Sequence, residues 1–93
     1  MSIADTTVFA HNEKCPVREI GDGLVIMAPS GDMTHSLEDI GAFVWQHIDG
    51  TRDFAGLVAA VTEAYAVEPE QAADDLRAFL AELVEAELVL TVD

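Results

Sequence analysis

The sequence has 93 residues, and its 18 Asp and Glu side chains against 4 Lys and Arg give a formal net charge of −14. An electrostatic field of this sign repels phosphate backbones and anionic bilayer surfaces, which excludes them as favoured partners. Because 51% of the residues are apolar, we expect a single folded domain with one core and not a disordered chain.

Targeting and membrane signals are missing from the sequence. The opening stretch MSIADTTVF has no basic segment followed by an apolar run of export length. No stretch approaches the roughly 20 apolar residues that span a bilayer. The single Cys15 rules out an internal disulfide. We therefore expect a cytoplasmic protein.

Residues 1–13 have no clear hydrophobic period, so we predict a flexible N-terminal segment over 1–13 and one domain over 14–93. The domain opens with three short strand-like runs separated by turn-forming clusters at 21–23 and 29–32. Two tight turns between short runs favour an antiparallel meander whose last strand lies at an edge. The three runs are Cys15–Ile20, Leu24–Ala28 and Met33–His35.

The stretch from Ser36 to Gly50 predicts the first helix and carries the only tryptophan. Ser36, followed three residues later by Asp39, is typical of a helix N-cap, and Asp49-Gly50 is typical of a helix end. Trp45 widens the apolar stripe of this helix, so we expect it in the core. The rest of the stripe is Leu37, Ile40, Val44 and Ile48.

Two further helices are predicted after this one. Asp53 suits the N-cap of a helix over 54–65, and Pro69 suits the first turn of the next helix. The expected fold class is α+β and winged-helix-like, with a small N-terminal antiparallel three-stranded sheet followed by three helices. In the third helix we expect a core stripe at Ala73, Leu76, Leu80, Leu83 and Val84, and a flanking row at Ala72, Asp75, Phe79 and Glu82.

The residues that carry chemistry form no catalytic or metal-binding pattern. The three histidines and Cys15 match no compact metal signature. No nucleophile lies in a recognisable elbow, and no glycine-rich loop leads from a strand into a helix as a phosphate cradle would. Asp74 and Asp75 point about 100° apart on a helix, so they do not converge. We therefore predict no enzyme activity, no metal and no cofactor.

A winged helix that binds DNA would have a similar shape, with its third helix as the reader. Here that segment carries six acids against the single Arg77, and such a helix is repelled from a groove walled by phosphates. We reject DNA binding for this reason. The six acids are Glu70, Asp74, Asp75, Glu82, Glu85 and Glu87.

An acyl or peptidyl carrier protein is the alternative that stays open. His35-Ser36-Leu37 is similar to the Ser-Leu motif at which carriers receive a phosphopantetheine arm, and small size and acidity fit as well. A carrier would have a helix upstream of Ser36, where this chain has strand-like runs. A capping role also accounts for Ser36 fully. The carrier is therefore the less favoured function.

From about Leu24 to Val89 the sequence resembles the PqqD family, the small proteins of pyrroloquinoline quinone (PQQ) biosynthesis. The same fold is the recognition element (RRE) of many systems that modify ribosomally made peptides (RiPPs). The sequence departs from the family pattern at Glu38, where Asn is preferred, and at Glu87, where Gly usually ends the last helix. The segments that carry the resemblance are Ser36-Leu37, Val44-Trp45, Asp49–Arg52, Tyr65–Pro69 and Asp75–Leu83.

The resemblance implies a PqqD-like, non-catalytic peptide-binding adaptor, a precursor peptide chaperone of natural product biosynthesis. The leader of the precursor would lie as an extra strand along the third strand, beside the third helix. The adaptor would deliver it to a modifying enzyme such as a radical-SAM protein or a leader peptidase. An edge strand beside an apolar helix flank favours the same groove independently. The expected peptide-binding residues are Met33, Thr34, His35, Ala72, Asp75, Leu76 and Phe79.

Overall fold

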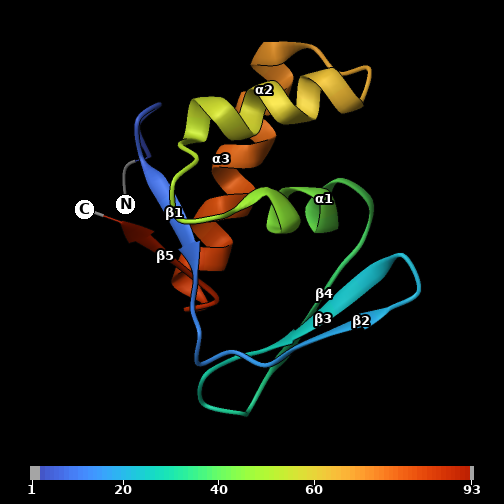
Figure 1. The fold of residues 1–93 in the computed structure, drawn as a ribbon, viewed down its shortest axis with the longest axis vertical. Helices are drawn as coiled ribbons and strands as arrows, with labels where there is room; N and C mark the ends of the chain where they lie inside the picture. The colour runs from blue at the N-terminus through green and yellow to red at the C-terminus, as the bar shows by residue number, and fades with distance from the viewer. Residues whose placement is uncertain (1–2, 93) are drawn as a thin grey trace.

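The computed structural model describes residues 3–92, which form five strands and three helices (Figure 1). Strands β2, β3 and β4 make a three-stranded antiparallel sheet, and β1 pairs antiparallel with β5 in a second sheet. The predicted α+β class, with a meander before three helices, is confirmed. The elements are β1 (Val8–His11), β2 (Val17–Ile20), β3 (Gly23–Met27), β4 (Thr34–Leu37), α1 (Asp39–His47), α2 (Phe54–Ala64), α3 (Pro69–Glu85) and β5 (Val89–Val92).

The meander forms where the sequence places its turns. The two-residue connection Gly21-Asp22 joins β2 to β3, and Gly21 has a φ of +61°, which glycine adopts without strain. Gly23 is required for a different reason, because a side-chain carbon there would lie 2.7 Å from the carbonyl oxygen of Leu37. The strand order β2-β3-β4 confirms that the third run of the meander lies at an edge.

Part of the N-terminal segment that is predicted to be flexible over 1–13 forms a strand in the structure. Within it, Val8–His11 form β1 and pair with β5, with Phe9 opposite Thr91. Phe9 is fully buried, and its carbonyl accepts from the backbone N–H of Gly50 at 3.0 Å. A short strand whose partner lies at the far end of the chain leaves no local period to detect. The first two residues lie outside the described part of the chain.

Helix α1 begins at Asp39, so the predicted capping role of Ser36 is wrong. Strand β4 continues through Leu37, whose buried side chain pairs with Leu24 across the sheet. Ser36 therefore lies in the strand with its side chain exposed. The N-cap residue is Glu38, which makes no side-chain capping bond, and Asp39 turns the chain with a φ of 51°.

The Asp49-Gly50 pair shapes the loop after α1 and does not end the helix itself. The C-cap is the extended residue Ile48, and Gly50 adopts its φ of +84° two residues later. The Asp49 carboxylate accepts from the backbone N–H groups of Thr51 and Arg52 at 2.9 and 2.8 Å. This turn directs the chain into α2.

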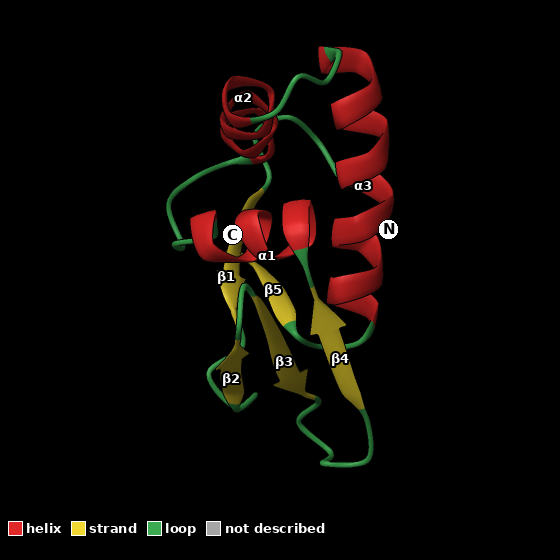
Figure 2. Ribbon diagram, turned by 90° about the vertical axis from the view of Figure 1, so that its right-hand side faces the viewer, coloured by secondary structure: helices red, strands yellow, loops and turns green. Residues whose placement is uncertain are grey.

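Helices α2 and α3 begin where the sequence predicts. The Asp53 carboxylate caps α2 by accepting from the N–H of Gly56 at 2.8 Å, and Pro69 occupies the first turn of α3. Figure 2 shows α3 along one side of the molecule, with α2 beside its N-terminal part and β4 beside its C-terminal part. Helix α3 therefore connects the helical end of the domain to the meander.

Helix α3 ends in a Schellman motif at Glu87. The N–H of Glu87 donates to the carbonyl of Val84, and the N–H of Leu88 donates to the carbonyl of Leu83, both at 3.0 Å. Glu87 has a φ of 64°, in the left-handed region that usually selects glycine. The PqqD family's preference for glycine at this position thus reflects the positive φ that the helix end requires. Glu87 adopts this φ at the cost of backbone strain.

Trp45 lies in the core as predicted, with 4% of its surface exposed. The ring of His11 stacks on the indole at a centroid distance of 3.9 Å, and its Nε2 donates to the carbonyl of Trp45 at 2.7 Å. This contact ties β1 to α1. The largest fully buried side chains are Phe9, Phe54, Ile26, Leu57, Leu80, Leu88, Val44, Val61 and Val89.

Candidate functional site

The outer edge of β4 presents backbone groups without a partner inside the described chain. The N–H of Ala28 donates to the carbonyl of Met33 at 2.9 Å, so that carbonyl points toward β3. In a trans peptide the next N–H points the opposite way, and the N–H of Thr34 therefore faces outward. Antiparallel pairing repeats this at alternate residues, which turns the N–H and C=O groups of Thr34 and Ser36 outward. The edge is a template for one more strand.

A groove of about 910 Å³ runs between this edge and the C-terminal half of α3. Strand β4 and the preceding loop form one wall of the groove, and α3 with the residues that end it forms the other. Figure 2 shows β4 lying beside the C-terminal part of α3. An extended peptide placed along β4 would therefore have α3 beside it. The groove is lined by Ala28, Pro29, Ser30, Asp32, Met33, Thr34, His35, Ser36, Leu37, Phe79, Glu82, Leu83, Glu85, Ala86 and Glu87.

The floor of the groove is apolar where α3 meets α1 and β4. The ring of Phe79 is half-buried and packs on the backbone of Gly41, where a side-chain carbon would lie 3.4 Å from its Cζ. Leu37 and Leu83 are buried beside the groove. One side of the Phe79 ring packs on α1, and the other side is open to the groove. Because the ring is already held in place, it loses little side-chain entropy when a peptide packs on it.

The structure brings four of the predicted site residues to the groove, namely Met33, Thr34, His35 and Phe79. It does not bring Ala72 and Leu76 there, because both are buried in the core with 2% and 3% of their surface exposed. The core stripe of α3 includes Ala72 where the sequence analysis expects Ala73, so the flanking row is displaced around the helix.

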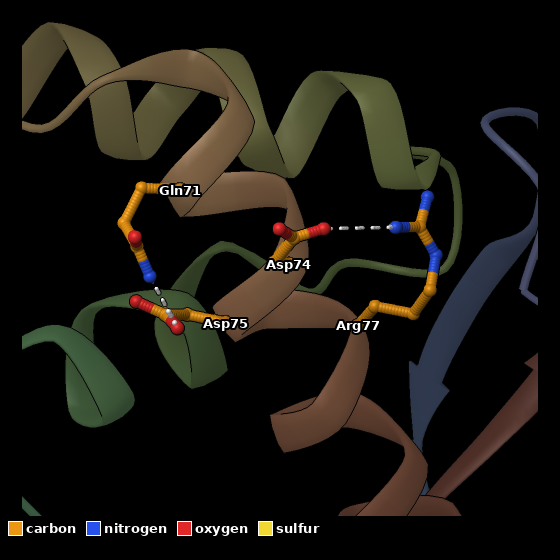
Figure 3. A network of polar contacts seen from close by, with 4 residues as sticks. All are labelled: Gln71, Asp74, Asp75 and Arg77. Atoms are coloured by element: carbon orange, nitrogen blue, oxygen red, sulfur yellow. Dashed lines mark hydrogen bonds and ion pairs between the residues drawn. The ribbon is translucent and has the colours of Figure 1, made fainter.

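Asp75 also lies away from the groove lining. Its side chain is exposed and accepts a hydrogen bond from Nε2 of Gln71, one turn earlier in α3, at 2.9 Å. Figure 3 shows this pair, and next to it the contact of Arg77 with Asp74 at 3.9 Å. These four side chains form an ordinary solvated helix surface.

The acidic wall of the groove is not predicted from the sequence. The spacing of Phe79, Glu82, Leu83 and Ala86 is that of one helix face, and continuing the flanking row past Glu82 would have reached Ala86. Glu87 joins the lining where its left-handed backbone turns the chain from α3 into β5. The acids of the lining are Asp32, Glu82, Glu85 and Glu87.

Two groups near the ends of the elements have shifted pKa values. Burial, and secondarily the charge of Glu87, raise the pKa of the Cys15 thiol, which disfavours the thiolate. Hydrogen bonds from the Thr51 and Arg52 backbones lower the pKa of Asp49 to about 2. Neither group lines the groove, and neither is placed to act on a peptide there.

The strand edges of β1 and β2 lack the features of the β4 edge. The outer edge of β1 is covered by the loop before α2, where the N–H of Phe54 donates to the carbonyl of Thr7 at 2.8 Å. All four residues of β2 are exposed, and none of the three helices described lies along its outer edge. A second hollow, of about 330 Å³, lies on the outer face of the meander and is lined by Pro16, Val17, Arg18, Ile20, Val25, Met27 and Thr34.

A metal ion, a membrane span and a phosphopantetheine arm would each require a particular arrangement in the described part of the chain. Within residues 3–92, no three His, Cys, Asp or Glu side chains gather so as to hold a metal ion. Over the same residues, no helix is both long and apolar enough to cross a membrane. Ser36 follows strands and not a helix, which disfavours the carrier alternative.

Comparison with known proteins identifies relatives of this arrangement. The family model of "Coenzyme PQQ synthesis protein D (PqqD)" matches residues 23–89, a span that includes both walls of the groove. Among solved structures, the chain is similar to "TbiB1 in Complex with the TbiA(beta) Leader Peptide". The TM-score is 0.78 and the identity 22%, over 86% of this chain and 93% of that chain. Curated protein sequences give no significant match.

Proposed function

The chain belongs to the PqqD family, and we propose that it binds the leader of a ribosomally made precursor peptide by adding it as a strand to β4. The observation that carries the proposal is the open β4 edge beside a helix-walled apolar groove. Thr34 and Ser36 offer backbone donors and acceptors, and β-strand addition satisfies such groups with main-chain hydrogen bonds. TbiB1, whose fold this chain shares, has been solved in complex with a leader peptide, which supports the proposal.

The register of β4 divides the side chains of an added strand between two faces. Peptide residues opposite Thr34 and Ser36 would share the outer face of the sheet with those two side chains. Residues opposite His35 and Leu37 would point toward α3, because Leu37 is turned into the core. Specificity for the leader would therefore reside in alternate peptide positions that contact Phe79 and its neighbours.

The domain acts in this proposal as an adaptor without catalysis of its own. It would hold the leader and present the rest of the precursor to a modifying enzyme, such as a radical-SAM protein or a leader peptidase, in PQQ or other RiPP biosynthesis. The side chains of the groove support a binding role, since they include no nucleophile paired with a base. A short peptide gene beside a gene for such an enzyme, next to the gene for this chain, would support the same role.

Truncation of Phe79 tests the groove assignment. Where a short peptide gene lies beside the gene for this chain, the probe is the synthetic leader half of its product, titrated by calorimetry. We expect Phe79→Ala to weaken binding by about 1–3 kcal/mol, because the ring loses apolar contact with the peptide. Phe43→Ala is the matched control, since Phe43 is another half-buried phenylalanine that lies outside the groove and packs on His47 and Tyr65.

The two variants separate binding from folding. Both are expected to lower the melting temperature, but the Phe43→Ala protein should keep its affinity for the leader as long as it is folded. Equal losses of affinity in the two variants, or an unchanged affinity in Phe79→Ala, would contradict the groove assignment. Circular dichroism at the titration temperature confirms that each variant is folded.

A further inference from the structure

The groove combines its apolar floor with charge of a single sign. Its lining holds four carboxylates and no Lys or Arg. Within the described residues 3–92, the one ion pair joins Arg77 to Asp74, on the surface of α3 away from the groove. The described part of the chain therefore supplies no cationic partner for the acids of the groove.

Two of these acids stand where they weaken the helix that carries them. Glu82 and Glu85 lie near the C-terminal end of α3, and the last turn of this helix has no basic residue. Negative charges there oppose the helix dipole, and carboxylates three residues apart repel each other. A cationic ligand in the groove would relieve both effects, which no Lys or Arg among residues 3–92 does by pairing with these acids.

We infer that the leader taken by this groove is an extended peptide whose face toward α3 alternates apolar and basic side chains. The inference rests on the proposed function, because it names the chemistry of the peptide that strand addition would bring. An apolar side chain seats against Phe79 and Leu83. The next side chain on the same face, a Lys or Arg, reaches Glu82 or Glu85.

The spacings of strand and helix fit this arrangement. Neighbouring side chains on one face of a strand are about 6.6 Å apart, and three residues of a helix rise about 4.5 Å. One step along the peptide face therefore covers the distance from the turn of Phe79 to the turn of Glu82. Acidic peptides of the same apolar pattern would meet four unpaired carboxylates and be rejected.

A selection from random peptides tests the inference without a known leader. A display library of random twelve-residue peptides is panned against the folded protein at low salt, and in parallel against the Thr34→Pro protein. Thr34→Pro removes the outward N–H of the edge but keeps the net charge, so peptides held by charge alone are recovered on both. We expect the sequences specific to the wild-type protein to be rich in Lys or Arg two residues from a large apolar residue.

The outcomes separate the inference from the proposed function. Wild-type-specific peptides with neutral or acidic residues at those positions would overturn the basic-leader inference and leave strand addition standing. Recovery of the same peptides on both proteins would overturn both, because it would show that the β4 edge does not contribute. Alternation of apolar and basic residues in the specific pool would support both.

Charge variants give a second, independent test. For the best selected peptide, Glu82→Gln with Glu85→Gln should weaken binding up to about fivefold at low salt, as the loss of one exposed ion pair predicts. The same double variant should raise the melting temperature, since the helix loses two unfavourable charges. Glu13→Gln with Glu63→Gln changes the net charge equally at exposed sites outside the groove, so binding should change much less. Equal effects of the two double variants would overturn the inference.

Discussion

At the scale of single residues, strain and hydrogen bonding concentrate where elements join. Glu87 ends α3 with a left-handed backbone, and its carbonyl accepts from Nδ2 of Asn12 at 2.7 Å and from Sγ of Cys15 at 3.5 Å. One strained residue thus fixes the end of α3, the start of β5 and the loop before β2. It also places a carboxylate at the groove.

Glu87→Gly should stabilise the domain. Glycine adopts positive φ without the steric cost of a Cβ, and the change also removes a negative charge from the end of a helix. We expect a gain of about 0.5–1 kcal/mol in the free energy of unfolding, after allowing for the extra freedom of glycine in the unfolded chain. Urea denaturation measures the gain. The control is Glu87→Ala, which removes the charge but keeps the strain, and an equal gain there would show that backbone strain is not the cause.

Asp49 should make the stability of the domain sensitive to acid. Its pKa is lowered from 3.8 to about 2 in the folded state, so the stability it contributes is present above pH 3.8 and is lost as the pH falls toward 2. Asp49→Asn should therefore be less stable than wild type at pH 6, with a difference that shrinks between pH 4 and pH 2, about the two pKa values. Melting temperatures at these pH values measure it. A difference that stays constant over this range would contradict the assignment.

At the scale of elements, the sequence predicts the ends of helices and strands correctly where contacts within one turn determine them. Asp53 and Pro69 mark helix starts correctly, because capping and the fixed φ of proline act within one turn. Ser36 misleads for the opposite reason: its capping signal is genuine, but the pairing of Leu37 with Leu24 extends the strand through it. Strand β1 is missed because its partner β5 is remote in sequence.

The candidate site shows the same division. Phe79 can be picked out as a groove residue from the sequence, because a large apolar side chain on the flank of a helix is unusual unless something covers it. Ala72 and Ala73 cannot be told apart in this way, since both are small and the rotation of α3 is set by the side chains of α2 that pack on it. The acids at 82, 85 and 87 become a feature only when β4 is placed beside them.

Proline substitution should distinguish the outward from the inward backbone of β4. Thr34→Pro removes an outward N–H and should leave the fold intact while reducing leader binding. His35→Pro removes an N–H that the register directs to Ile26, so it should destabilise the sheet. Val17→Pro is the matched control, because the carbonyl of Pro16 accepts from Met27 and the N–H of Val17 therefore faces outward on β2. Loss of leader binding in Val17→Pro, with binding kept in Thr34→Pro, would show that the peptide adds to β2 and would contradict strand addition to β4.

At the scale of the whole molecule, charge repulsion works against folding. The net charge of −14 is held within principal extents of 35 × 32 × 19 Å. At 10 mM ionic strength the Debye length is about 30 Å, so nearly all the acids repel one another, whereas at 150 mM it is about 8 Å. The fold tolerates a field that a basic partner would partly neutralise.

Sodium chloride should therefore stabilise the free protein. We expect the melting temperature at neutral pH to rise between about 10 and 150 mM salt, over which the screening length falls fourfold. The rise should be smaller in a variant with two acids replaced by glutamine, such as Glu13→Gln with Glu63→Gln. A melting temperature that is flat or falls over this range would show that net repulsion is not a significant term.

The most direct measurement of strand addition is residue-resolved amide hydrogen exchange, with and without the best selected peptide. In the free protein the amides of His35 and Leu37, which the register directs to β3, should exchange slowly, and those of Thr34 and Ser36 should exchange quickly. A peptide added as a strand to β4 should slow the exchange of Thr34 and Ser36. A saturated complex in which these two amides still exchange quickly, while protection appears over α2 at 54–64, would contradict the account.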